Sequence, residues 1–144
     1  MKRGVVSLFV VAVCVGQVFG GKKERRVVPE LGNVNTLFVI GNSQAADKAR
    51  EMLKEGKLCL ALALKKEEAD AVLDVTDSAT GDGGVLRTRT SIVSATVTLR
   101  SGELVWSDSQ RFSDAPFTSG SKTAAKLLIT DLGHAADCKN RKRK

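Results

Sequence analysis

The clearest strand pattern of this chain lies in residues 91–107, Ser-Ile-Val-Ser-Ala-Thr-Val-Thr-Leu-Arg-Ser-Gly-Glu-Leu-Val-Trp-Ser. From Val93 to Leu99 every second residue is apolar, and the residues between them are Ser94, Thr96 and Thr98. This period of two is typical of a strand with one buried and one solvated face. A four-residue turn containing a glycine follows, and a second apolar run then begins. The stretch therefore predicts a β-hairpin whose Thr-rich face is partly exposed.

Four segments before the hairpin also show a regular pattern. Residues 36–40 predict a buried strand, and a helix follows from an N-cap at Ser43 to a C-terminal Gly56. Residues 58–64 alternate leucine with Cys or Ala, which predicts a strand buried on both faces, although the same residues would also suit an extension of the helix. After a polar turn, residues 71–75 predict the next strand.

A final amphipathic helix is expected after the hairpin. Ser121 is its predicted N-cap, and apolar residues recur at helical spacing from Ala124 to Ala135. The predicted order is β-α-β-β-β-β-α. It describes a single α/β (α+β) domain over residues 36–138, with a mixed sheet of four or five strands and both helices packed on one face. A chain of 144 residues that is 42% hydrophobic suits one such core.

The glycine-rich stretch 77–85 raises two cofactor hypotheses. A phosphate-binding loop would need a following Lys-Ser/Thr and a helix, and a calcium loop would need alternating acidic ligands and a closing Glu. Asp77 and Asp82 do not provide that ligand pattern, and Ser/Thr-rich strand sequence follows the glycines. We therefore predict a plain solvent loop here and no cofactor.

Residues 1–20 have the pattern of a secretory signal peptide. Two basic residues precede an apolar run over 5–15, and small residues precede a predicted cut after Gly20. The run is shorter than the roughly 20 apolar residues of a membrane span. We expect a secreted or periplasmic protein, with a retained N-terminal anchor as the alternative. Cys14 lies inside the apolar run, directly after the branched Val13, which does not fit a lipid-attachment site.

The positive charge of the chain is concentrated at its two ends. The formal net charge is +7, yet residues 27–138 carry 12 basic and 15 acidic side chains. We expect a basic extended linker over 21–35 and a basic disordered tail over 139–144. These ends are either solvated or contact an anionic lipid or polymer surface, so membrane contact is at most peripheral. They contain no aromatic residue, which disfavours sequence-specific nucleic-acid recognition. The candidate surface contacts are Lys22, Lys23, Arg25, Arg26, Lys139, Arg141, Lys142, Arg143 and Lys144.

Removal of the leader would leave two cysteines, Cys59 and Cys138, in a compartment where thiols oxidise. Cys59 lies on the small-residue side of its predicted strand, and Cys138 ends the helix that must cover the sheet. We predict a disulfide between them, with two free thiols as the alternative.

The inventory of reactive residues argues against catalysis. The chain has one histidine, His134, and no nucleophile-elbow pattern. A zinc site would have to combine His134 and Cys138 with distant ligands, and the spacing does not support it. Trp106 in the hairpin fits a packing role better than a ligand platform. We assign no catalytic residue, no metal and no enzyme activity.

Several segments together resemble a family of domains. They are Val39-Ile40-Gly41-Asn42, the helix 46–53, Ala69-Asp70 before a strand, and Gly102-Glu103-Leu104-Val105-Trp106-Ser107. This pattern, over residues 36–137, resembles small exported bacterial α/β domains of the curli-secretion-lipoprotein, penicillin-binding-protein-activator and TolB N-terminal types. The resemblance implies a non-enzymatic envelope or periplasmic module that binds a protein or a cell-envelope polymer. The alternative is an anionic-surface binder that acts through its basic termini.

Overall fold

The predicted hairpin forms the longest strand pairings of the structure. In the computed structural model, which describes residues 26–80, 90–113 and 119–141, β4 (Thr90–Leu99) and β5 (Leu104–Ser113) pair antiparallel from Thr90 opposite Ser113 to Thr98 opposite Leu104, with a register shift between Val97 and Thr98. β3 (Ala71–Thr80) pairs with the other edge of β4, in the register Leu73 to Val97. This arrangement explains the alternating sequence, because β4 has a neighbour on each side and a buried and an open face.

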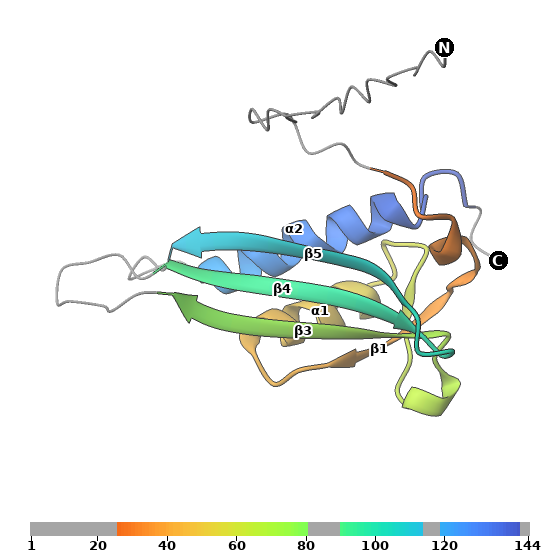
Figure 1. Cartoon of the computed structure of the whole chain (residues 1–144), viewed down its shortest axis with the longest axis horizontal. Coiled ribbons are helices and arrows are strands. Elements are labelled where there is room, and N and C mark those ends of the chain that lie inside the picture. The colour runs from red at the N-terminus through yellow and green to blue at the C-terminus, as the bar shows by residue number, and fades with distance from the viewer. Residues whose placement is uncertain (1–25, 81–89, 114–118, 142–144) are drawn as a thin grey trace, which may run out of the picture.

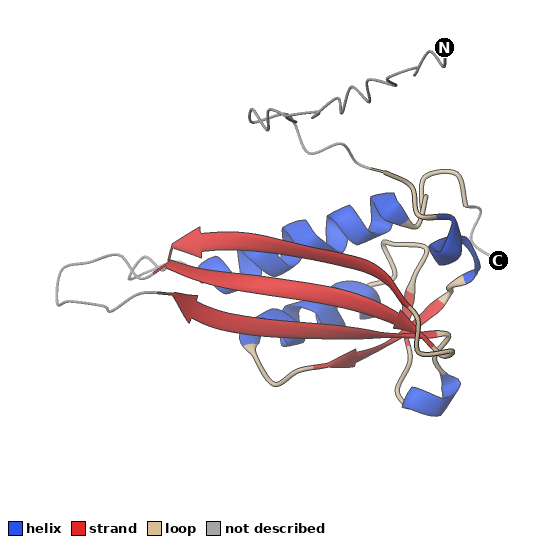
Figure 2. Ribbon diagram, viewed as in Figure 1, coloured by secondary structure: helices blue, strands red, loops and turns tan. Residues whose placement is uncertain are grey.

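The sheet has five strands in the order β2-β1-β3-β4-β5 (Figure 1). β1 (Thr36–Ile40) runs parallel to both of its neighbours, β2 (Ala61–Leu62) and β3. The remaining elements are α1 (Gln44–Lys54), α2 (Gly120–Ala135) and two short 3₁₀ helices, η1 (Pro29–Asn33) and η2 (Lys66–Glu68). The predicted order and fold class are therefore confirmed, with five strands and both helices on one face of the sheet (Figure 2).

The core lies between the sheet and the two helices. α1 and α2 pack against each other as well as on the sheet. The buried side of α1 consists of three alanines and Leu53, whereas α2 buries larger side chains, among them Leu128 and Leu132, beside small ones. The largest fully buried side chains are Leu31, Leu37, Leu53, Leu60, Leu73, Leu128, Ile129, Leu132, Val93 and Val97.

The stretch 58–64 is neither the long strand nor the helical extension considered above. Gly56 has φ +65° and its N–H donates to the carbonyl of Leu53, which ends α1. Only Ala61 and Leu62 pair with β1. Leu60 points into the core, but Leu64 is 84% exposed, so the run is not buried on both faces.

Two strands are longer than the sequence indicated. β3 continues to Thr80 and β5 to Ser113, because the polar residues at these strand ends pair as well as the apolar residues before them. Asp77 and Ser78, expected in a loop, lie opposite Val93 and Ile92. The glycines of the hypothetical phosphate or calcium loop lie outside the described residues.

The starts of the domain and of α2 also differ from expectation. The segment expected to be an extended linker contains η1, whose Leu31 is fully buried. α2 begins at Gly120 with Ser119 at its N-cap, so Ser121 lies two residues too late to cap it. The Ser121 hydroxyl is buried and has no hydrogen-bond partner in the described part of the chain. Position 120 requires glycine, because a Cβ there would run into the ring of Phe112.

Candidate functional site

The helices cover one face of the sheet and leave the other uncovered. Along β3 and β4, Leu73 and Val97 are fully buried under the helices, and Asp74 and Thr96 lie on the opposite face. None of the described helices covers that second face, which we call the open face (Figure 1).

Hydroxyl groups dominate the open face. Thr96 on β4 lies between Asp74 on β3 and Ser107 on β5. One pair further along, Ser94 lies between Thr76 and Ser109, so short polar side chains run across three strands. These side chains are exposed or half-buried. This part of the sheet therefore presents donors and acceptors at a regular spacing on a rigid backbone.

A hollow of about 800 Å³ lies at the β1 side of the open face. Its floor is partly apolar, because Ile40 and Val72 contribute to it, and Asp74 adds one carboxylate. Lys66 and Glu67 of η2 line its rim. The complete lining is Ile40, Lys66, Glu67, Ala69, Ala71, Val72, Asp74, Thr96, Thr98, Leu99, Arg100 and Gly102.

Arg100, which lines this hollow, and the neighbouring Asp70 hold chain segments together beside it. The Arg100 guanidinium donates to the carbonyls of Glu67 (2.7 Å) and Ala69 (2.9 Å), which ties η2 to the hairpin turn. The Asp70 carboxylate accepts from the backbone N–H groups of Asn35 (2.9 Å) and Thr36 (3.0 Å), and from the Thr36 hydroxyl. Burial raises the pKa of Asp70, but these hydrogen bonds and the charge of Arg100 outweigh it, so its pKa lies below the usual value.

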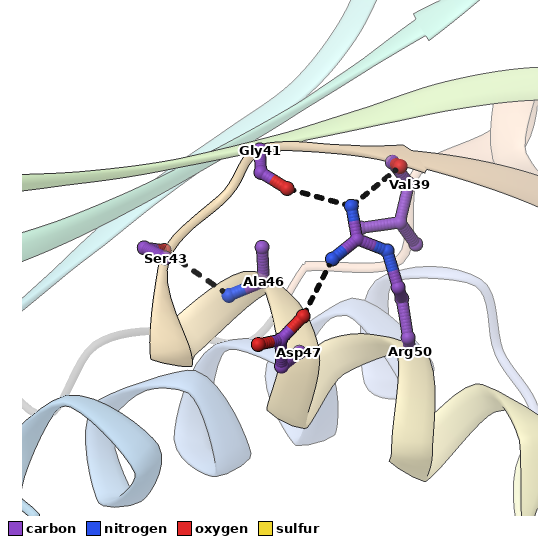
Figure 3. Close-up of polar contacts among 6 residues, drawn as sticks. All are labelled: Val39, Gly41, Ser43, Ala46, Asp47 and Arg50. Atoms are coloured by element: carbon purple, nitrogen blue, oxygen red, sulfur yellow. Dashed lines mark hydrogen bonds and ion pairs between the residues drawn. The ribbon is translucent and has the colours of Figure 1, made fainter.

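A second polar network, which the sequence did not reveal, closes the other end of β1 (Figure 3). Arg50 donates to the carbonyls of Gly41 (2.6 Å) and Val39 (3.3 Å) and forms an ion pair with Asp47. Ser43 caps α1 as predicted, by accepting from the N–H of Ala46. The signal for Arg50 was weak, because an Arg on a charged helix face usually points to solvent.

The structure joins Cys59 and Cys138 in a disulfide, with Cα atoms 5.1 Å apart. The bridge connects the segment before β2 to the turn after α2. It therefore ties the helical layer to the edge of the sheet.

The candidate surface-contact residues fall into three groups. Arg26 and Lys139 are exposed on the described chain, whereas Arg141 is half-buried. The Arg141 guanidinium donates to the carbonyls of Leu31 (3.1 Å) and Val34 (2.7 Å) and to the Asn35 side chain (2.7 Å). Arg141 is therefore a structural residue of the domain, not part of a disordered tail. The third group, Lys22, Lys23, Arg25, Lys142, Arg143 and Lys144, lies outside the described residues.

The remaining candidate residues for metal or ligand binding do not form a cluster in the described chain. His134 lies near the end of α2, and in the described chain no three His, Cys, Asp or Glu side chains are arranged to hold a metal ion. Trp106 is half-buried and packs against the core, in register with Val97. Among the described helices, none combines the length and the apolar character that crossing a membrane requires.

Comparison with known proteins identifies the class of fold. No family model and no curated protein sequence matches this chain. Its structure is similar to the PelC dodecamer from Paraburkholderia phytofirmans, with 18% identity and a TM-score of 0.50 over 69% of this chain and 87% of that one. It also matches lipoprotein GNA1162 from Neisseria meningitidis, with 15% identity and a TM-score of 0.41 over 71% and 98% of the two chains. At these identities the likeness is one of fold, that of small bacterial α/β domains.

Proposed function

We propose that this protein is an exported, non-enzymatic accessory protein of the cell envelope, which binds a protein or polymer partner through the open face of its sheet. The observation that carries the proposal is the contrast between the two faces of the sheet. One face is closed by α1 and α2, while the other offers rows of hydroxyls beside a hollow of about 800 Å³. A rigid sheet that presents short polar side chains is suited to recognition.

The chemistry of the hollow favours binding over catalysis. Its lining contains no histidine or cysteine, and its arginine is already bonded to two backbone carbonyls. The hydroxyls on this face therefore have no nearby imidazole to activate them as nucleophiles. They retain their ordinary ability to donate and accept hydrogen bonds, which a binding role requires.

The comparisons add one candidate partner. PelC from Paraburkholderia phytofirmans, a protein of similar fold, forms a dodecamer. We therefore include a second copy of this chain among the partners that the open face would bind.

A site-specific crosslinking experiment tests this proposal. A photoreactive amino acid replaces Thr96, on the open face, in the chain expressed in its own envelope. The control places it at Lys126, an exposed residue of α2. We expect a discrete crosslinked species from position 96 and none from position 126, and mass spectrometry would identify the partner or a second copy. Equal labelling from both positions, or none from position 96, would contradict the role of the open face.

A further inference from the structure

The hollow on the open face contains a carboxylate that the fold itself does not use. Asp74 lies on β3 between Ile40 of β1 and Thr96 of β4, and all three residues line the hollow. The Asp74 side chain is exposed, and within the described ranges no hydrogen bond or ion pair reaches its carboxylate. The negative charge of Asp74 is therefore available to a ligand that enters the hollow.

Other carboxylates of the domain have structural partners. Asp47 forms an ion pair with Arg50 at 2.8 Å, next to the end of β1. Asp70 accepts from two backbone N–H groups at 2.9 and 3.0 Å. These carboxylates hold segments of the fold together, whereas no described contact of the fold requires a carboxylate at position 74.

The two basic side chains of the hollow do not neutralise Asp74. The guanidinium of Arg100 is held by the carbonyls of Glu67 and Ala69, at 2.7 and 2.9 Å. Lys66 lies on η2 at the rim and forms no ion pair with Asp74 in the described structure. Opposite charges attract more strongly beside apolar surface than in bulk water, because the effective dielectric constant is lower there. The hollow therefore favours a cationic group from a ligand at Asp74.

The residues next to Asp74 indicate what carries this cationic group. Ile40, which is 40% exposed, and Val72, two residues earlier on β3, provide apolar surface beside the carboxylate. Thr96, directly opposite on β4, provides a hydroxyl oxygen. An alkyl chain can lie on the apolar surface while an ammonium group at its end donates to the carboxylate and the hydroxyl. A lysine side chain has this combination of an apolar stem and a charged end.

We propose that the hollow binds a lysine side chain of a protein partner, with the ammonium group at Asp74 and the alkyl stem on Ile40 and Val72. This inference rests on the proposed function, because it names the chemistry by which the open face recognises its partner. A single protein side chain fits better than a polymer with a repeating positive charge. In the described strands Asp74 is the one acidic residue on the open face, so a repeating charge would meet no second carboxylate there.

Binding of small amines to the mature protein, purified from an exporting host, tests the site itself. The probe is n-butylamine, which has the stem and the ammonium group of lysine. The matched probes are n-butanol, which is neutral, butyrate, which is anionic, and methylamine, which lacks the stem. We expect n-butylamine to shift the backbone amide NMR signals of residues 72–76 and 94–98. It should bind about tenfold more tightly than methylamine, because its extra methylene groups are partly buried.

Two substitutions examine the charge and the stem separately. Asp74→Asn should weaken n-butylamine binding by about fivefold, the upper end for a partly exposed ion pair. Glu30→Gln removes a carboxylate from an exposed position of η1 outside the hollow, and it should leave binding unchanged. Ile40→Ala should weaken n-butylamine and leave methylamine unchanged. Thermal unfolding checks that each variant is folded.

The outcomes that would overturn the site are specific. Undetectable n-butylamine binding, or signal shifts confined to other parts of the chain, would show that the hollow is not an ammonium site. Equal losses in Asp74→Asn and Glu30→Gln would show that net charge alone acts. Butyrate or n-butanol bound as tightly as n-butylamine would remove the role of the Asp74 charge.

The same substitution connects the site to the partner. Crosslinking from position 96 should fall by about fivefold in the Asp74→Asn chain, and mass spectrometry should place the crosslink beside a lysine of a protein. An unchanged yield, or a crosslinked species that is not a protein, would overturn the lysine site and leave the open face as a binding surface. Absence of any crosslink from position 96 would contradict the proposed function, and the n-butylamine titration would still decide whether the hollow binds an ammonium group.

Discussion

Leu73 and Asp74 are neighbours in one strand, yet they belong to surfaces with opposite properties. Leu73 is fully buried beneath the helices, and Asp74 lies on the open face beside Thr96. The covered face accounts for most of the stability, because apolar area removed from water is the main favourable contribution to folding. The side chains of the open face make few apolar contacts. Substitutions there therefore cost little stability, and these residues can be suited to binding a partner. The comparison predicts large stability effects on one side and small ones on the other.

The largest effect is expected where the helical layer is tied to the sheet. Replacing both Cys59 and Cys138 with Ser removes a link between residues 79 positions apart. The chain-entropy model gives a loss of about 4 kcal/mol in the free energy of unfolding for a loop of this length. Urea unfolding of the double variant measures it, and the reduced wild-type protein should lose a similar amount. A loss below about 1 kcal/mol would show that the layers hold together without the bridge.

A pair of adjacent substitutions compares the two faces directly. Leu73→Ala should lower the free energy of unfolding by about 3 kcal/mol, because the buried side chain leaves a cavity. Val72→Ala, one residue earlier and half-buried on the open face, should cost about 1 kcal/mol or less. Urea unfolding of both variants provides the measurement. Equal costs would mean that the open face is covered in the folded protein.

A smaller loss in the free energy of unfolding is expected from substitution of Asp70, and this loss depends on pH. Because hydrogen bonds from Asn35 and Thr36 lower the pKa of Asp70, its ionised form stabilises the folded state. This contribution is complete above the unfolded-state pKa of about 3.9 and is lost as the pH falls through the lower folded-state pKa. Asp70→Asn should cost about 1 kcal/mol at neutral pH, and less in acid.

Unfolding measured from neutral pH into acid tests this. The difference between wild type and Asp70→Asn should shrink as the pH falls. A difference that stays constant would contradict the contribution of the Asp70 charge. Asp74→Asn, at an exposed carboxylate of the open face, is the comparison variant.

The smallest stability effect belongs to the centre of the open face. Thr96→Val keeps the shape of the side chain and removes its hydroxyl, and we expect the free energy of unfolding to change by less than about 0.5 kcal/mol. The proposed partner should nevertheless bind more weakly, because a donor and acceptor is lost. Unfolding and partner crosslinking measured on the same variant separate the two effects. A large loss of stability would place Thr96 in a structural role.

Most of the fold could be predicted because the deciding signals are local. The alternation of β4, the N-cap Ser43 and the C-terminal Gly56 each act within a few residues. The ends of the strands were harder to predict. A polar strand residue such as Asp77 cannot be distinguished from a loop residue until its pairing partner is known. β2 was predicted too long because a run of Leu and Ala carries no information about where the sheet ends.

The candidate surfaces were less predictable. Arg141 was expected in a basic tail, and its three hydrogen bonds depend on a segment more than 100 residues earlier in the chain. Arg50 likewise binds carbonyls that only the folded β1 presents. The disulfide could be anticipated, because the predicted removal of the leader would leave just two cysteines, and a pairing between two residues has no alternative partner.

The hydrogen bond between Val28 and Ala135 also means that the order of the chain is not essential to this sheet. Because the segment at Val28 lies against the end of α2, a linker could join the segments that precede Val28 and follow Arg141, and new ends could be opened in the turn at Gly102, where a Cβ would meet nothing within 4 Å. Such a circular permutant would have the same strands in a different chain order. It would begin with β5 and end with β4, with the former termini joined into a loop.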